Sequence, residues 1–495
     1  MWSALKKCLV VLLGLLLQLS FTLLITVYFG QKLQVLQIIN FTISVVALYL
    51  LTKNNRNNSY TFPWVIIILL FPLGGGILYL TLGRNKKKSK LLKKVNEKRL
   101  EYLKYYKLNK KVLNENLDNG QVNYLSKFLG FPVTKYNQVV YFKTGEDAYN
   151  GMKEEIKKAQ KYIFLEYFII RPGKMWTELL NLLAEKAKSG VDVRLMYDDF
   201  GCVDKLTDDY KDYLQSLGIK CVIFNELKPI RGVIMNNRDH RKILVIDGEV
   251  AFTGGINIGD EYINEINRFG NWKDNSIMVK GEAVWSYTIM FLTIWDTYHL
   301  YHDDVEKFKS KKKYLDNGLV IPYDDSPLDD ESTGKNVYLT IINNSKKYLY
   351  ISTPYLILDM EIIDAFKLAI RRGVDVRIII PGVPDKKIVY MLSESYANTL
   401  IREGVKVYKY EKGFLHSKMF VSDDIEGVVG TINLDYRSLF LHFECGLYMY
   451  NTSCLQDIKK DFQEMFKSNK EIIIKRQFFG KTLLQTILRL FSFML

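Results

Sequence analysis

The segments HRKILVIDG at residues 240–248 and FLHSKMFVSDD at residues 414–424 share one pattern. In each segment a histidine is followed two residues later by a lysine, and further on by an aspartate. The members of the two motifs are His240, Lys242 and Asp247 in the first, and His416, Lys418 and Asp423 in the second. The chain contains only 5 histidines, so two matches to one pattern are poorly explained by chance.

A second repeated string supports an internal duplication. The letters GVDVR occur at residues 190–194 and again at residues 373–377. Each copy precedes one histidine motif at a similar distance, which a chance match would not produce. Repetition at a fixed period is typical of a duplicated structural unit, and we therefore predict two copies of one βα unit.

The hydrophobic pattern around both motifs is that of an α/β protein. Short apolar runs alternate with amphipathic segments, which predicts strands and helices in alternation. The expected strands are residues 162–170, 191–197, 220–224, 243–246, 348–352, 374–380 and 419–421, and the expected helices include residues 176–187 and 361–370.

The spacing within each motif has a structural meaning. Residues i and i+2 of a strand project to the same face, so the histidine and lysine of each motif point together. We expect the two pairs to meet in one shared active site. Asp247 and Asp423 follow the apolar strands, and we expect them near strand ends, where they orient an imidazole or pair with a lysine.

Glycine-rich segments follow both motifs and are candidates for substrate binding. Glycine lets the backbone approach a phosphate closely, and an asparagine amide can donate hydrogen bonds to its oxygens. The residues that we expect to bind substrate are Gly255 and Asn257 after the first motif, and Thr431, Asn433 and Glu444 after the second.

These residues suit phosphodiester exchange without a metal or cofactor. Two lysines and two asparagines can neutralise the phosphoryl oxygens. One imidazole attacks phosphorus and forms a phosphohistidine, while the other protonates the leaving alkoxide and then deprotonates the incoming hydroxyl. The motifs are symmetric, so the residues themselves leave open which histidine is the nucleophile.

The other histidines and the cysteines carry less information. We interpret His299 and His302 as packing or surface residues, and His442 as either lining the site or lying at the surface. The 5 cysteines are scattered and form no C-x-x-C pair. This argues against a disulfide framework or a zinc site and fits a catalytic part that faces the cytosol.

The amino-terminal residues differ from the rest of the chain. Apolar runs occupy residues 8–29, 38–51 and 62–82, the last interrupted by Pro72 and by the glycines at 74–76. A bilayer-spanning helix needs about 20 apolar residues. We therefore expect a membrane anchor over residues 1–83 with two or three apolar segments, and a helical hairpin around residues 54–60.

A basic stretch follows the anchor. Residues 84–111 contain 13 lysines or arginines against 2 glutamates, within a chain of net charge +15. Such a cluster beside an apolar segment favours anionic lipid headgroups and the cytosolic side of the membrane, with nucleic acid as the competing partner.

The expected domain organisation follows from these features. We assign residues 84–130 to a basic linker, 131–305 to the first repeat, 306–335 to a linker between repeats, and 336–495 to the second repeat. The last 15 residues have the period of an amphipathic helix. Such a helix either lies in the membrane interface or packs on the core.

The chain resembles the phospholipase D superfamily and, within it, the bacterial cardiolipin synthases. Besides the two motifs, the similar segments are FTGGINIGDEY at 252–262, NWKDNSIMVKG at 271–281, STPYLI at 352–357 and GTINLDYRS at 430–438. Thr431 and His442 depart from the pattern that is common in this family, which bears on headgroup or acceptor preference.

The resemblance implies a fold, a reaction and a location. Two phospholipase D-like repeats would pack as a pseudo-two-fold pair with one shared active site, preceded by transmembrane helices. One phosphatidylglycerol would donate its phosphatidyl group to another with release of glycerol, with His240 as nucleophile and His416 as general acid and base. The protein would be a multi-pass protein of the bacterial cell membrane, with its catalytic part in the cytoplasm and anionic lipids, not nucleic acid, as partners.

Three rival functions remain open. A phospholipase D hydrolase or a phosphatidylserine synthase would use the same residues with a different acceptor. A membrane-tethered nuclease would also tolerate the basic stretch. A non-catalytic scaffold that binds anionic lipids would need neither histidine, although both motifs are intact.

Overall fold

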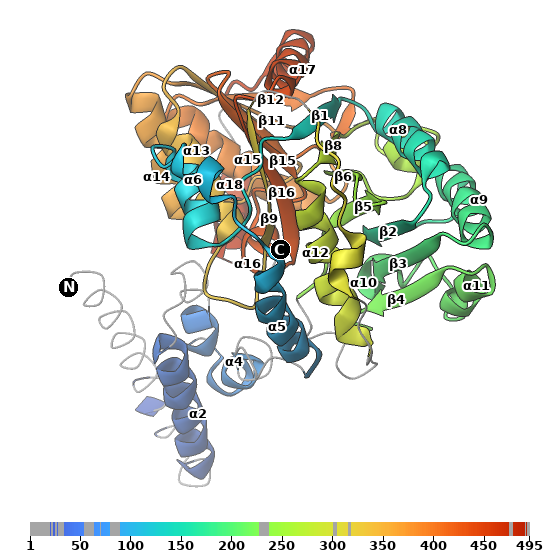
Figure 1. Cartoon of the computed structure of the whole chain (residues 1–495). Helices are drawn as coiled ribbons and strands as arrows, with labels where there is room; N and C mark the ends of the chain where they lie inside the picture. Colours follow the sequence, from blue (N-terminus) through green and yellow to red (C-terminus); the bar gives the residue numbers. More distant parts are fainter. Residues whose placement is uncertain are drawn as a thin grey trace. The chain divides into compact units, whose positions relative to one another are not determined.

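The computed structural model describes residues 34–53, 64–69, 71–79, 90–226, 237–299, 304–314, 318–474 and 479–490, together with residues 20, 23, 24, 27 and 492. The chain divides into two compact units. The first comprises residues 1–89 and 479–495, and the second comprises residues 90–478 (Figure 1). Most of the apolar run at 8–29, the hairpin at 54–60 and His302 lie outside the described residues.

The first unit is helical where it is described, with α2 (Gln34–Lys53), α4 (Pro72–Leu78) and α18 (Phe479–Leu490). Pro72 occupies the first turn of α4, where its missing N–H is no loss. A Cβ at Gly76 would lie 2.5 Å from Cγ2 of Ile43, so the glycines in the third apolar run allow α4 to pack closely on α2. Among the described residues, no helix is both long and apolar enough to cross a membrane.

The second unit begins with short helices, the first of which are formed by residues of the basic stretch. They are α5 (Lys90–Tyr102), η3 (Leu103–Tyr105), α6 (Lys110–Asn114), α7 (Gly120–Val122) and η4 (Asn123–Phe128). Leu92, Val95 and Tyr102 of α5 are buried in an apolar cluster with α12 (Val284–Trp295). Much of residues 90–128, part of the segment that we assigned to the basic linker, is therefore helical, and α5 has one packed face.

The first repeat forms a mixed sheet in the order β1-β8-β6-β5-β2-β3-β4. Strands β2, β3 and β4 run parallel, and β5 is antiparallel to β2. The strands are β1 (Asn137–Phe142), β2 (Tyr162–Tyr167), β3 (Asp192–Asp198), β4 (Lys220–Phe224), β5 (Lys242–Ile246), β6 (Val250–Gly254) and β8 (Ser276–Gly281).

The second repeat forms a sheet of the same topology, in the order β17-β12-β11-β10-β14-β15-β16-β9. Read from the other end, β9, β16, β15, β14, β10, β11 and β12 match β1, β8, β6, β5, β2, β3 and β4. The strands are β9 (Leu319–Asp325), β10 (Tyr348–Ser352), β11 (Asp375–Pro381), β12 (Lys406–Tyr410), β14 (Met419–Ser422), β15 (Glu426–Gly430), β16 (Glu444–Tyr450) and β17 (Lys470–Glu471).

The predicted duplication of one βα unit is confirmed, and the strands lie close to their expected positions. One boundary differs from the expectation. Strand β9 falls within the segment that we assigned to the linker between repeats, yet it pairs with β16 along the edge of the second sheet. The second repeat thus begins at Leu319, because β9 has the same place in its sheet as β1 has in the first.

The helices lie mainly on the outer faces of the sheets (Figure 1). Those of the first repeat are α8 (Gly145–Lys158), α9 (Lys174–Lys188), α10 (Asp199–Cys202), α11 (Tyr210–Ser216), η6 (Asp260–Ile263), α12, η7 (Asp296–Tyr298) and η8 (Val305–Phe308). Those of the second are α13 (Thr333–Asn344), α14 (Met360–Arg371), α15 (Lys387–Arg402), α16 (Tyr436–Phe440) and α17 (Cys454–Ser468).

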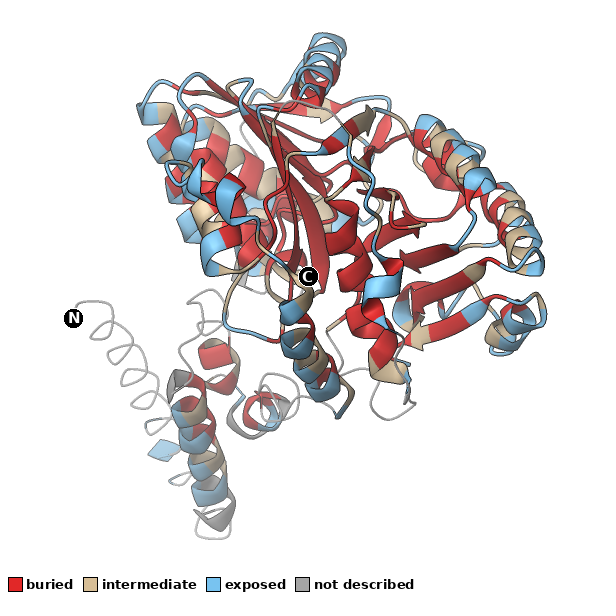
Figure 2. Cartoon of the chain, viewed as in Figure 1, coloured by how far each residue is buried: buried red, intermediate tan, exposed pale blue. Residues whose placement is uncertain are grey.

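The core lies on both faces of each sheet. Figure 2 shows buried strands and α12 in the interior, with helices such as α8 and α9 exposed on one side only. All residues of α12 are buried, as expected for a helix that is apolar all round. Apolar residues of β1 and β8 pack against those of β14, β15 and β16, so the two sheets share a core.

The repeated letters correspond to a repeated local structure. Gly190 and Gly373 follow the ends of α9 and α14 with positive φ angles of 94° and 86°, where a Cβ would be strained. The next acidic residues, Asp192 and Asp375, each form ion pairs with the arginine two residues later and with a lysine of the neighbouring strand.

Candidate active site

The first motif lies at the start of β5. Lys242 is the first residue of this strand and pairs with Tyr167, the last residue of β2. Because β2, β3 and β4 are parallel, His240 and Lys242 sit at the carboxyl edge of these strands. The backbone N–H of His240 donates to the carbonyl of Phe443 in the second repeat over 2.9 Å, and Nζ of Lys242 donates to the carbonyl of His240 over 2.6 Å.

The second motif has the same arrangement at the start of β14. The backbone N–H of His416 donates to the carbonyl of Lys273 in the first repeat over 2.7 Å. Nζ of Lys418 donates to the carbonyl of His416. Both lysines are 1% exposed, and the two histidines are also buried.

Each histidine is held by a carboxylate from the other repeat. Nδ1 of His240 lies 2.9 Å and 3.0 Å from the two carboxylate oxygens of Glu444, and Nδ1 of His416 lies 2.7 Å from Oδ2 of Asp274. Because a carboxylate only accepts, each Nδ1 carries the proton, and each Nε2 keeps a lone pair. Both imidazoles are thereby prepared to act through Nε2.

The backbone explains why the pairs cross between repeats. Phe443 precedes Glu444, and its N–H donates to the carbonyl of Arg238 over 2.8 Å. On the other side, β7 (Asn271–Lys273), which precedes Asp274, runs parallel to β13 (Gly413–Leu415) and pairs with it. The segment before each histidine therefore lies beside the segment before the opposite carboxylate.

Gly255 and Thr431 occupy matching positions in the two repeats but act differently: the glycine leaves space, and the threonine makes hydrogen bonds. A Cβ at Gly255 would lie 2.0 Å from Oδ1 of Asp274, so glycine leaves room for the carboxylate that holds His416. The Thr431 hydroxyl instead donates to the Glu444 carboxylate and accepts from the N–H of Cys445. Both residues thus support a histidine–carboxylate pair.

The other residues predicted to bind substrate have mixed placements. Glu444 contacts His240, and Asn257 is used within the protein, because it accepts from the N–H of Ile169 over 3.1 Å and donates to the Tyr262 hydroxyl over 2.8 Å. Asn433 is buried, and its Oδ1 has no hydrogen-bond partner among the described residues. A contact of Asn433 with phosphate stays a prediction.

Asp247 and Asp423 directly follow β5 and β14, as expected, but the expectation that they orient an imidazole or pair with a lysine is wrong. Asp247 accepts from the backbone N–H groups of residues 160–162, each over 2.8 Å, and Asp423 accepts from those of residues 346–348. Both have left-handed backbones, with φ of 54° and 56°. Each lies at the far end of its strand from the histidine, so it closes a turn before β2 or β10 and orients no imidazole.

Burial controls the protonation of the histidines. It lowers the pKa of His240 to about 3, an effect that Glu444 opposes and Lys242 increases. It lowers the pKa of His416 to about 4, with Lys418 acting in the same direction and Asp274 against it. Burial alone would raise the pKa of Glu444, but the attraction of His240 and its hydrogen bond hold that pKa well below its usual range.

The lysines link both motifs into one electrostatic site. Burial lowers the pKa of Lys242 to about 8 and that of Lys418 to about 7. Charges from both repeats act on each lysine: Glu444 and Asp274 raise both pKa values, and Lys242 lowers that of Lys418. Both lysines lose their protons more easily than a solvated lysine does. A bound anion would stabilise their charged, protonated forms, so the site is suited to bind an anion.

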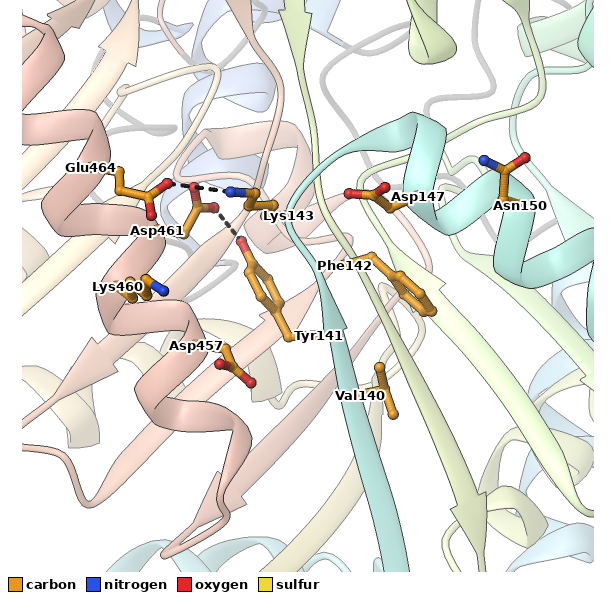
Figure 3. A pocket seen from close by; sticks show the side chains of 10 residues that line it. All are labelled: Val140, Tyr141, Phe142, Lys143, Asp147, Asn150, Asp457, Lys460, Asp461 and Glu464. Atoms are coloured by element: carbon orange, nitrogen blue, oxygen red, sulfur yellow. Dashed lines mark hydrogen bonds and ion pairs between the residues drawn. The ribbon is translucent and has the colours of Figure 1, made fainter.

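A cavity of about 560 Å³ lies elsewhere, between β1 and α17 (Figure 3). The Tyr141 hydroxyl donates to the Asp461 carboxylate at its wall over 2.6 Å, and Lys273 donates to the same carboxylate over 2.7 Å. Neither motif contributes to its lining. Its connection to the active site is structural, because Lys273 is the residue before Asp274.

Comparison with known proteins identifies the family. A family model described as "Cardiolipin synthase, PLD-like domain" matches residues 152–290 and 338–466. A cardiolipin synthase of Alkalihalophilus pseudofirmus is 34% identical over 91% of this chain and 92% of its own length. The chain belongs to the cardiolipin synthase family.

Three other matches cover this member of the cardiolipin synthase family in whole or in part. A protein of Streptococcus mutans without a described function is 44% identical over 85% of this chain and 93% of its own length. A model described as phospholipase D-nuclease N-terminal matches residues 42–84. The crystal structure of a phosphatidylserine synthase from Haemophilus influenzae has the same fold, with a TM-score of 0.59 at 16% identity, covering 76% of this chain and all of that one.

Sequence reasoning missed one residue of this cardiolipin synthase family site. The Asp274 carboxylate accepts a hydrogen bond from Nδ1 of His416, yet only its counterpart Glu444 was among the expected site residues. A signal was present, because an acidic residue follows the glycine-rich segment in both repeats. His442, left open between site and surface, lies in the site: its ring centroid is 5.5 Å from that of His240.

Proposed function

We propose that this chain is a membrane-bound phosphatidyltransferase that makes cardiolipin from two molecules of phosphatidylglycerol, with glycerol as the other product. The observation that carries the proposal is the pair of imidazoles, each held through Nδ1 by a buried carboxylate of the opposite repeat and each followed by a buried lysine. Homologous cardiolipin synthases over most of the chain support the choice of substrate.

In the first half-reaction Nε2 of His240 attacks phosphorus, and the P–O bond to the glycerol headgroup breaks. His416 gives a proton to the departing glycerol oxygen, and Asp274 stabilises the imidazolium before that transfer. The product is a phosphatidyl group on His240. Lys242 and Lys418 balance the negative charge of the phosphoryl oxygens throughout.

In the second half-reaction the free glycerol hydroxyl of another phosphatidylglycerol loses its proton to His416. Its oxygen attacks phosphorus, and the bond from phosphorus to His240 breaks. Cardiolipin leaves, and both histidines return to their first protonation states. The assignment of His240 as nucleophile follows the family resemblance, since both half-sites have the same hydrogen-bond pattern.

The reaction needs a protonated imidazole and charged lysines, and a bound phosphodiester favours these protonated forms. In the free protein burial lowers the pKa values of both histidines and both lysines. An anion beside these groups favours their protonated forms. Substrate binding therefore prepares the imidazolium that serves as acid.

We further propose that the first unit attaches the enzyme to the bacterial membrane, with the second unit in the cytoplasm. The support is the apolar composition of residues 8–29, 38–51 and 62–82 and the basic stretch that follows them. Helix α18, with exposed Leu483, Leu484 and Ile487, adds an apolar face suited to an interface. A site close to lipid favours a lipid acceptor over water.

The deciding experiment is product analysis of the purified protein in detergent, with headgroup-labelled phosphatidylglycerol as the sole lipid. Equal amounts of cardiolipin and glycerol are expected. Phosphatidic acid with glycerol, and no cardiolipin, would identify a hydrolase. Turnover should be lost or strongly reduced in both His240→Ala and His416→Ala. If the protein were a non-catalytic lipid-binding scaffold, neither substitution would change its function.

A further inference from the structure

The side chains of His240, His442 and Glu444 converge closely. One ligand atom from each, an imidazole nitrogen from the histidines and a carboxylate oxygen from the glutamate, can be chosen so that all three lie within 4.8 Å of one another. Nδ1 of His442 is 3.8 Å from Oε1 of Glu444, and Nδ1 of His240 is 2.9 Å from the same oxygen. These spacings bracket the separation of neighbouring ligands around a transition metal, about 3.4 Å for bonds of 2.1 Å.

The third histidine has unused binding capacity. Nδ1 of His442 is buried and has no hydrogen-bond partner among the described residues, because 3.8 Å is too long for a hydrogen bond. The role proposed for Glu444 and His240 in transfer does not require this atom. A buried nitrogen that faces a carboxylate without bonding to it is suited to share a cation with that carboxylate.

The backbone holds the three residues in place. His442 and Glu444 flank Phe443, whose N–H and carbonyl both bond to the segment that carries His240. The N–H of His442 donates to the carbonyl of Arg437 over 3.1 Å. Little rearrangement is therefore needed to bring the three side chains around an ion. Because the fold already restricts these residues, little conformational entropy is lost when an ion binds.

We propose that His240, His442 and Glu444 form an inhibitory site for a divalent transition-metal ion such as Zn²⁺ or Co²⁺. Two imidazoles and one carboxylate are ligands that these ions prefer, and three protein ligands leave a fourth position for water. Mg²⁺ and Ca²⁺ require more oxygen ligands and are not accepted. The binding of the ion does not depend on the identity of the lipid product, whereas the inhibition rests on the proposed role of His240 in transfer.

The inhibition follows from the tautomer of His240. In the free enzyme Nδ1 carries the proton and Nε2 the lone pair. A metal bonded to Nδ1 moves that proton to Nε2, so the atom that attacks phosphorus loses its lone pair. A metal bonded to Nε2 occupies the attacking atom directly. In both cases the bound ion blocks the first half-reaction.

The test is a titration of the purified, metal-free full chain in detergent with Co²⁺, followed by visible absorption and calorimetry. One equivalent is expected to bind, with the intense bands of four-coordinate Co²⁺. His442→Asn removes one ligand, and we expect its affinity to fall more than about 100-fold, since loss of even an outer partner of a ligand costs 10–100-fold. His299→Asn is the matched control, because Nδ1 of His299 bonds to the Trp295 carbonyl away from the site.

A parallel measurement uses Zn²⁺ with phosphodiester substrate, each variant being compared with its own metal-free rate. Wild-type and His299→Asn proteins should be inhibited in competition with substrate, and His442→Asn should resist. Unchanged Co²⁺ affinity in His442→Asn, or no stoichiometric binding to the wild type, would overturn the proposal. If the product analysis disproved cardiolipin synthesis while His442→Asn still lost Co²⁺, the metal site would stand and only the proposed function would fail.

Discussion

Nδ1 of His240 in the first repeat lies 2.9 Å from Oε1 of Glu444 in the second, and the reverse pair, His416 with Asp274, is 2.7 Å apart. Each histidine thus depends on a carboxylate from the other repeat. Neither repeat alone contains a complete acid–base pair. This exchange gives a physical reason for two diverged copies to remain in one chain.

The first prediction concerns the two histidines. His416→Ala should lower the turnover number by about 10²–10⁴-fold, the usual contribution of a general acid and base. His240→Ala should remove turnover altogether, because no phosphorus–nitrogen bond can form. Phosphatidylglycerol labelled at phosphorus, which stays with the phosphatidyl group, should leave acid-labile label on the His416→Ala protein and none on His240→Ala. The opposite distribution of label would exchange the roles of the two histidines.

The carboxylates that hold the histidines provide the second prediction. Glu444→Gln and Asp274→Asn should each reduce turnover by up to about 10⁴-fold, the effect of losing the correct imidazole tautomer. Both proteins should fold, since the changes keep side-chain volume. Asp457→Asn, at the separate cavity, is the control and should leave turnover unchanged. Normal turnover in Asp274→Asn would mean that its bond to His416 is not needed.

The third prediction is that substitutions of Asp247 and Asp423 lower the free energy of unfolding more than they lower turnover. Asp247→Ala removes the acceptor of three backbone N–H groups and places alanine at a φ of 54°. We expect a loss of about 2–4 kcal/mol, measured as a lower urea midpoint, with activity per folded molecule largely retained. Exposed Asp212→Ala should change neither quantity. A folded Asp247→Ala protein without activity would restore a catalytic role for this residue.

The fourth prediction is a pH dependence that follows from Lys418. Burial lowers its pKa to about 7, so the ammonium is charged below that pH and neutral above it. Because the cation attracts the phosphodiester, kcat/KM should fall as pH rises above about 7, and kcat less so, since bound phosphate restores the charge. The charged neighbours that modulate this pKa are Asp274, Lys242, Glu444 and Asp435.

A matched variant tests the assignment to Lys418. Arginine stays protonated throughout this range. Lys418→Arg should therefore move the falling limb of kcat/KM to higher pH, even where its absolute activity is lower. An unshifted limb would assign the pH dependence to another group.

Gly255 provides the fifth prediction. In Gly255→Ala the new Cβ would lie 2.0 Å from Oδ1 of Asp274 and must displace this carboxylate from His416. We expect turnover to drop at least about 10-fold, as for loss of other partners of active-site groups. Gly120→Ala, where a Cβ meets nothing within 4 Å, should be neutral in the same assay. Full activity in Gly255→Ala would show that Asp274 can move without consequence.

The sequence by itself determined the duplicated α/β architecture and the two histidine–lysine pairs of the candidate site. Both inferences depend on local signals. An i, i+2 spacing places His240 and Lys242 on one face of a strand wherever that strand packs. Glycine after a helix, as at Gly190 and Gly373, marks a helix end through its own backbone geometry. Such features need no knowledge of distant contacts.

The tertiary structure alone decided which carboxylate serves which histidine and what the motif aspartates do. His240 and Glu444 are 204 residues apart, and Asp274 and His416 are 142 apart, so no local spacing could pair them. The pairing arises because strands from the two repeats lie side by side. The same strand geometry that brings the histidines together carries Asp247 and Asp423 to the opposite end of the sheet, where their carboxylates satisfy backbone N–H groups instead.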